Sequence, residues 1–153
     1  MVTFRYELTG RGWADCTLQI GDRSVTASAS YLSNALDDFA RAVVAILNGD
    51  ASASAEFTEE PGHFTWQFDR TDGDDLRVRL FWSLPRWNDE AHDPGTPLFD
   101  ETCRLRTFAA QLLSELQRLQ SQHGPAGYKD LWVLHEFPTR RLTQLESLLR
   151  TTP

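Results

Sequence analysis

The 153-residue sequence predicts an α+β protein, in which an antiparallel sheet built from two three-stranded meanders carries helices on its apolar face. Apolar and polar residues alternate in two stretches, residues 4–27 and 55–82, and each stretch is divided by Gly-containing turn signals. Apolar residues at helical spacing follow each of these stretches. This order, βββ-α-βββ-α-α, is typical of the α+β class.

The first meander is aligned by its turns. A three-residue turn at 10–12 and a two-residue turn at 21–22 place Phe4 opposite Leu18, and Leu18 opposite Val25. Because a slip of one residue would scatter these apolar side chains to both faces of the sheet, the register is well specified.

The second meander contains the turn Glu60-Pro61-Gly62-His63, in which Pro and Gly occupy the positions that a type II turn prefers. This turn predicts that Phe57 pairs with Trp66. The following turn, TDGDD, allows Trp66 to pair with Arg79 or with Leu80. We favour Leu80, because that register also places Asp69 opposite Arg77.

Helices are predicted after each meander. In SNALDDFARAVVAILNG, Ser33 is a plausible N-cap and Gly49 can end the helix. Its expected buried stripe consists of Leu32, Leu36, Phe39, Val43, Ile46 and Leu47. Thr96-Pro97 is expected to open a second helix that Gly124-Pro125 ends, and Pro138 a third. For GYKDLWVLHEF we favour a helical turn over an edge strand.

We expect residues 1–153 to form a single domain, since this length suffices for one hydrophobic core. The first residues read as a strand, not as a signal peptide, and the longest apolar run is too short to span a bilayer. Cys16 and Cys103 lie far apart in sequence, which favours reduced thiols and a cytoplasmic location. No cofactor is expected, because the common phosphate-loop, dinucleotide and hydrolase signatures are missing.

The charge is concentrated in the middle of the chain. Residues 50–101 hold thirteen Asp or Glu against four Arg, a balance of −9, whereas the net charge of the whole chain is −7. Such a segment repels phosphate backbones, so nucleic acid is a poor candidate partner and another protein with a basic surface a better one. The alternative is that the acidic residues only maintain solubility.

The stretch FWSLPRWNDEAHDPGTPLF contains a long irregular connection, which is often a sign of function. Trp87 either folds back onto the sheet or anchors a partner, and we favour packing onto the protein. Asp89, Glu90, His92 and Asp93 are candidate binding residues, and we expect the carboxylates of Asp89, Glu90 and Asp93 to face water. Their irregular spacing is a weak signal for a metal, and no metal site is predicted.

A second candidate site lies on the first meander. Its register places Glu7 directly opposite Asp15 on the outer face, with Trp13 one step along. Two adjacent carboxylates can act as an acid/base dyad or a metal clamp, because each raises the pKa of the other. The alternative, which we favour, is that Arg5, Arg77 or Arg79 neutralises them.

GWADCTLQIGD, SYLSNALDDFARAVVAILNGD, EEPGHFTWQF and GYKDLW…EFP…L resemble a family of small uncharacterised bacterial proteins. The resemblance spans nearly the whole chain and carries no catalytic signature. In size, acidity and single-domain organisation, though not in any motif, the chain also resembles the immunity proteins that neutralise bacterial toxins.

The sequence therefore favours a non-enzymatic protein-binding domain, with an immunity-type antagonist as its narrower form. The second hypothesis is a small enzyme or ligand-binding domain centred on Glu7 and Asp15. A deep polar cleft with converging titratable groups would distinguish the enzyme from the binding protein.

Overall fold

The structure is a computed structural model that describes residues 1–84, 95–133 and 135–151. The described residues form two antiparallel sheets. The first has the strand order β1-β2-β3 and the second β4-β5-β6-β7. Their bounds are β1 Val2–Gly10, β2 Trp13–Ile20, β3 Arg23–Ser30, β4 Ser52–Thr58, β5 His63–Arg70, β6 Asp75–Ser83 and β7 Thr96–Arg104.

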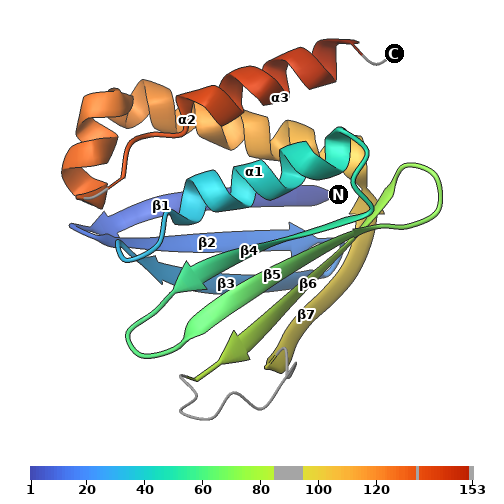
Figure 1. Cartoon of the computed structure of the whole chain (residues 1–153), viewed down its shortest axis with the longest axis horizontal. Coiled ribbons are helices and arrows are strands. Elements are labelled where there is room, and N and C mark those ends of the chain that lie inside the picture. The colour runs from blue at the N-terminus through green and yellow to red at the C-terminus, as the bar shows by residue number, and fades with distance from the viewer. Residues whose placement is uncertain (85–94, 134, 152–153) are drawn as a thin grey trace.

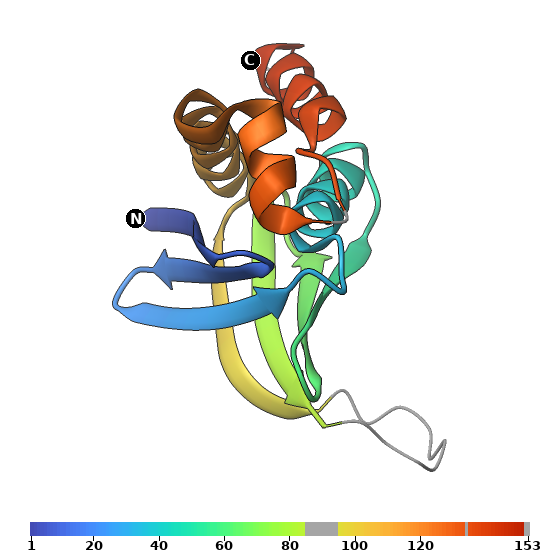
Figure 2. The ribbon, with the colours of Figure 1, turned by 90° about the vertical axis from the view of Figure 1, so that its left-hand side faces the viewer.

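The helices α1 (Ala35–Leu47), α2 (Leu105–Trp132) and α3 (Thr139–Thr151) gather on one side of the two sheets (Figures 1 and 2). α2 is interrupted at Gly124, whose φ of 67° and ψ of 166° are not helical. The predicted stop at this Gly-Pro pair is therefore confirmed, and so is the helical reading of GYKDLW. No helix of the described residues has the length and hydropathy needed to cross a bilayer.

The α+β class is confirmed, but the single sheet of two three-stranded meanders is wrong. The meanders form separate sheets, and β7 adds a fourth strand to the second one. The stretch that begins with Thr96-Pro97 belongs to β7, and α2 starts only at Leu105. Pro followed by acidic residues reads as a helix start, yet Pro is also tolerated on an edge strand, where no ladder partner needs its missing N–H.

The predicted registers hold for three of the four strand pairs for which one was predicted. Phe4 faces Leu18 and Trp66 faces Leu80, as expected. Phe57, however, pairs with Phe64 and not with Trp66. The amide of Glu59 donates to the carbonyl of Gly62 at 2.9 Å, so the turn encloses Glu60-Pro61 instead of Pro61-Gly62. This shift of two residues leaves every side chain on its predicted face.

The start of α1 also differs from the expectation. The hydroxyl of Ser33 accepts a hydrogen bond from the Thr58 amide at 3.0 Å, and Asn34 occupies the N-cap position. Leu32 precedes the helix and is exposed, whereas the rest of the predicted stripe is buried or partly buried. Ser33 therefore ties α1 to β4 instead of capping the helix.

The core is centred on Phe39 of α1, which is fully buried. Its ring stacks on Phe4 of the first sheet at a centroid distance of 4.9 Å. It also contacts Trp66 and Phe68 of the second sheet at 5.3 and 5.2 Å, and Phe108 of α2 at 6.0 Å. One side chain thus joins α1, α2 and both sheets.

At the edge strands β1 and β4, a carboxylate and a guanidinium group from a helix hydrogen-bond to the strand backbone. On β1, the Tyr6 amide donates to Glu115 of α2 at 2.6 Å, and Arg118 donates to the Tyr6 carbonyl at 3.0 Å. On β4, the Glu56 amide donates to Asp38 of α1 at 2.9 Å, and Arg41 donates to the carbonyl of Ser54 at 2.9 Å. These side chains occupy backbone groups that another chain could otherwise pair with.

Both cysteines are free thiols, as expected. Cys16 is fully buried on β2, and Cys103 is partly buried on β7.

Candidate functional site

A row of polar groups crosses the outer face of the first sheet. Glu7 of β1 lies opposite Asp15 of β2, and Asp15 lies opposite Ser28 of β3. Directly paired residues of antiparallel strands project on the same face. The hydroxyl of Ser28 is hydrogen-bonded to the carboxylate of Glu59, which lies in the turn between β4 and β5. The row of carboxylates therefore continues from the first sheet to the second.

A shallow hollow adjoins this row at the β4–β5 turn. Its lining combines the exposed Leu32 and Pro61 with three carboxylates, Glu56, Glu59 and Glu60. No Lys or Arg is among the described residues that line it. We call the surface formed by Glu7, Asp15, Glu56, Glu59 and Glu60 the acidic face.

Gly62 holds the β4–β5 turn against the end of β6. Its φ is 92°, which L side chains rarely adopt. A Cβ at this position would lie 2.7 Å from the carbonyl oxygen of Ser83 and 2.9 Å from the ring of Trp82. Only Gly permits this approach, so the turn that carries Glu59 and Glu60 is packed against a strand end, and Glu56 lies beside it on β4.

Most of the acidic face lacks a neutralising cation. Within the described residues, Asp15, Glu56, Glu59 and Glu60 form no ion pair, and only Glu7 does, with Arg5 at 3.2 Å. Carboxylates on nearby surfaces behave differently, as in the pairs Asp69–Arg79, Asp100–Arg77 and Asp38–Arg41. The unpaired carboxylates leave the acidic face with uncompensated negative charge.

Glu7 and Asp15 differ in their ion pairs, since Arg5 pairs with Glu7 and no described Lys or Arg pairs with Asp15. The predicted opposition of the two residues is confirmed, both side chains are exposed on an open sheet face, and of the predicted cations Arg5 pairs with Glu7 alone. Neither residue lines any of the cavities described here. Among the described residues, no three His, Cys, Asp or Glu side chains are grouped to hold a metal.

The remaining predicted site residues divide into two groups. Trp13 lies on β2 next to Asp15 on the same face and is half-buried. Trp87, Asp89, Glu90, His92 and Asp93 lie outside the described residues. The predictions for these five therefore stay predictions.

The sequence reasoning missed the hollow. It treated Glu59 and Glu60 only as flanks of a turn and assigned Leu32 to the core. One signal could have indicated the site, since an exposed turn carrying adjacent carboxylates lies in the most acidic third of the chain. That Leu32 comes to lie beside this turn depends on how α1 packs, and no local pattern shows it.

No known family model matches the sequence, and no curated protein matches it significantly. Among solved structures, the fold is similar to a chain of the CdiA-CT/CdiI toxin and immunity complex from Enterobacter cloacae. The TM-score is 0.47 and the sequence identity 10%, and the alignment covers 76% of this chain and 99% of the other. A similarity at this level does not identify a function.

Proposed function

We propose that the protein is a non-enzymatic binding domain that holds a basic protein partner on its acidic face. The observation that carries this proposal is the hollow at the β4–β5 turn, where exposed apolar groups are rimmed by carboxylates that pair with no Lys or Arg of the described residues. Apolar contact supplies affinity at the centre of an interface, and the surrounding charges steer the partner and fix its orientation.

The proposal also includes the connection between β6 and β7. Its sequence adds Asp89, Glu90 and Asp93 to the acidic residues of the chain, with Trp87 and His92 as further candidate contacts. The narrower form of the proposal is an immunity-type antagonist, whose partner is a toxin with a basic surface.

The test reverses charge on the acidic face. Glu56→Lys combined with Glu60→Lys changes two exposed carboxylates that form no ion pair with any described residue. Partners are recovered with the full chain as bait, beginning with the product of the neighbouring gene, and association rates are measured with the purified partner at low and physiological salt. We expect association at low salt to slow by about tenfold or more, because steering depends on these charges.

The matched control is Asp50→Lys combined with Asp72→Lys. It gives the same change in net charge at exposed positions outside the acidic face. Equal association rates for both double variants would contradict the proposal.

Reversal of Asp89, Glu90 and Asp93 together tests the β6–β7 connection in the same assay. In the narrower form, co-expression of the chain relieves growth inhibition by the partner, and the Glu56/Glu60 variant does so less.

A further inference from the structure

The β7 edge of the four-stranded sheet differs from the edges at β1 and β4. Those edges carry the pairs Glu115–Arg118 and Asp38–Arg41 described above. The backbone of residues 96–104, by contrast, bonds only to β6 within the described part of the chain. Among the described residues, the backbone groups on the side of β7 that faces away from β6 are therefore without partners.

The groups that point outward follow from the ladder. The Leu105 amide donates to the carbonyl of Asp74 at 2.8 Å, so the backbone of residue 105 faces β6. Backbone direction alternates along an antiparallel strand. The N–H and C=O groups of Asp100 and Thr102, and the N–H of Arg104, therefore face away from β6. The side chain of Asp100 is already engaged by Arg77 at 2.8 and 2.6 Å, and this hydrogen bonding lowers the pKa of the Asp100 carboxyl.

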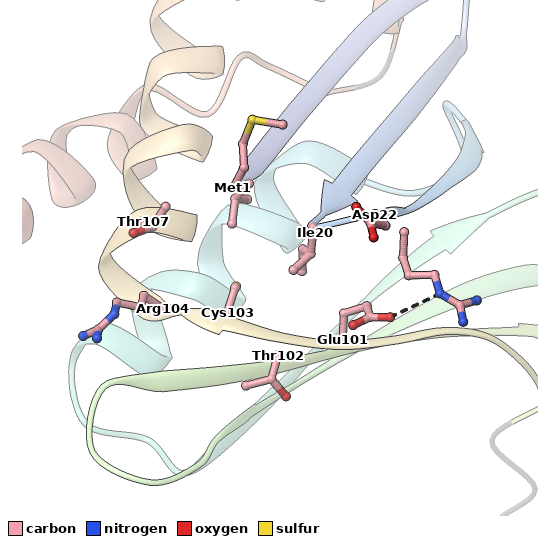
Figure 3. A pocket seen from close by; sticks show the side chains of 11 residues that line it. Met1, Ile20, Asp22, Glu101, Thr102, Cys103, Arg104 and Thr107 are labelled. Carbon is pink, nitrogen blue, oxygen red and sulfur yellow. Dashed lines mark ion pairs between the residues drawn. The ribbon is translucent and has the colours of Figure 1, made fainter.

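A groove runs along β7 beneath the β2–β3 hairpin. One cavity of about 470 Å³ lies between the hairpin tip, which includes Ile20 and Asp22, and the β7 residues 101–104 (Figure 3). A second cavity of about 350 Å³ continues past Pro97 and Leu98. Both cavities are lined by Arg23 and Glu101, whose ion pair spans 3.8 Å. We call the two cavities together the β7 groove.

We propose that the β7 groove binds an extended segment of a partner protein, which joins the second sheet as a strand antiparallel to β7. This inference rests on the proposed function, because it assigns to the protein partner a second contact, distinct from the acidic face. Strand addition supplies main-chain hydrogen bonds for affinity, and alternate side chains enter pockets that give specificity.

The side chains of the groove define the chemistry of this segment. Glu101 and Cys103 project from β7 toward the hairpin, where Asp22 and Ile20 also line the cavity (Figure 3). The only cation paired with Glu101 among the described residues is Arg23, whose side chain is 77% exposed, so this ion pair contributes little to stability. A basic side chain opposite Glu101 would therefore be favoured, with an apolar one opposite Cys103 against Ile20.

A single strand fits this edge better than a second copy of the chain. In Figure 2, the β2–β3 hairpin projects beyond β7. A neighbouring strand needs about 4.8 Å beside β7, whereas a second whole sheet would also have to pass the hairpin. The groove thus selects an isolated extended segment.

The probe is the acetylated and amidated peptide Thr-Val-Thr-Lys-Thr-Val, which sets its lysine opposite Glu101 and its first valine opposite Cys103 when antiparallel. Amide hydrogen exchange of the full chain is measured by NMR with millimolar peptide. We expect the Asp100, Thr102 and Arg104 amides to exchange at least about fivefold more slowly. Methylating the backbone nitrogens of the second and third threonines, which face β7, should abolish this effect. Methylating those of the first valine and the lysine, which face away, should preserve it.

The corresponding protein variants are Thr102→Pro, which removes one outward N–H without breaking the β6 ladder, and Thr102→Ala, which keeps it. The peptide should slow amide hydrogen exchange on β7 in the Ala variant and not in the Pro variant. Absence of protection by the unmodified peptide, or equal protection by both methylated peptides, would overturn the inference whether or not the Pro variant folds. Neither result depends on the Glu56/Glu60 charge reversal, so the binding function and the strand addition can fail separately.

Discussion

Cys103 shows how tertiary packing sets the chemistry of a single residue. Burial against the core raises the pKa of its thiol to about 11, and the carboxylate of Asp75 adds to the shift. Cys16 is fully buried, and burial likewise raises the pKa of its thiol. Because the thiolate is the reactive form, neither cysteine suits nucleophilic or redox chemistry at neutral pH.

The reactivity of Cys103 should therefore depend steeply on pH. With a pKa of about 11, only about one Cys103 side chain in a thousand is a thiolate at pH 8. Alkylation by iodoacetamide, followed by mass spectrometry, should accelerate about tenfold per pH unit between pH 7 and pH 10. A free cysteine peptide, the control, should level off above pH 9. A plateau for Cys103 near pH 9 would contradict the raised pKa.

At the scale of elements, β1 depends on α2 for the closure of its edge. Glu115 is 5% exposed and accepts hydrogen bonds from the Tyr6 amide and from Arg118. These hydrogen bonds raise the pKa of the Arg118 guanidinium. Glu115 and Arg118, which we call the β1 clamp, give the backbone of this edge strand the partners that a neighbouring strand would otherwise supply.

Glu115→Ala should lower the free energy of unfolding by about 2–4 kcal/mol, because it leaves the Tyr6 amide without its acceptor and removes the carboxylate that pairs with Arg118. Urea unfolding at pH 7 measures this loss. The control is Glu136→Ala, which breaks an exposed ion pair with Lys129 and should cost less than about 1 kcal/mol. Similar losses of unfolding free energy for both variants would show that the β1 clamp stabilises the protein no more than an exposed ion pair does.

At the scale of the whole molecule, Phe39 links both sheets and α2 through one ring. The residues buried around it belong to a continuous core that draws on every helix and on both sheets. We therefore propose that residues 1–153 unfold as a single domain and not sheet by sheet.

Phe39→Ala should destabilise the protein by about 3–5 kcal/mol through the lost burial and the cavity that it leaves. Both sheets should still unfold in one transition, followed by far-UV circular dichroism and by tryptophan fluorescence. Phe81→Ala is the control, since Phe81 is only half-buried and should cost less. Two separated transitions would contradict the single domain.

The α+β class, the registers of β1–β2, β2–β3 and β5–β6, and the buried faces of these strands could be predicted from the sequence by itself. Alternating residues such as Phe4 and Tyr6, and the turn TDGDD, are local signals that each specify a face or a pairing. The confirmed opposition of Glu7 and Asp15 belongs to this class, because it follows from register alone.

Only the tertiary structure decided that the meanders form two sheets, that Thr96–Arg104 is a strand, and that Leu32 and Glu59 share a surface. In each case the outcome depends on contacts between elements far apart in the chain. The segment Thr96–Arg104, with its Pro and carboxylates, has no strong local preference, so its conformation is set by β6, with which it pairs. The acidic face and the β7 groove both join residues far apart in the chain, and their existence depends on packing that no local pattern encodes.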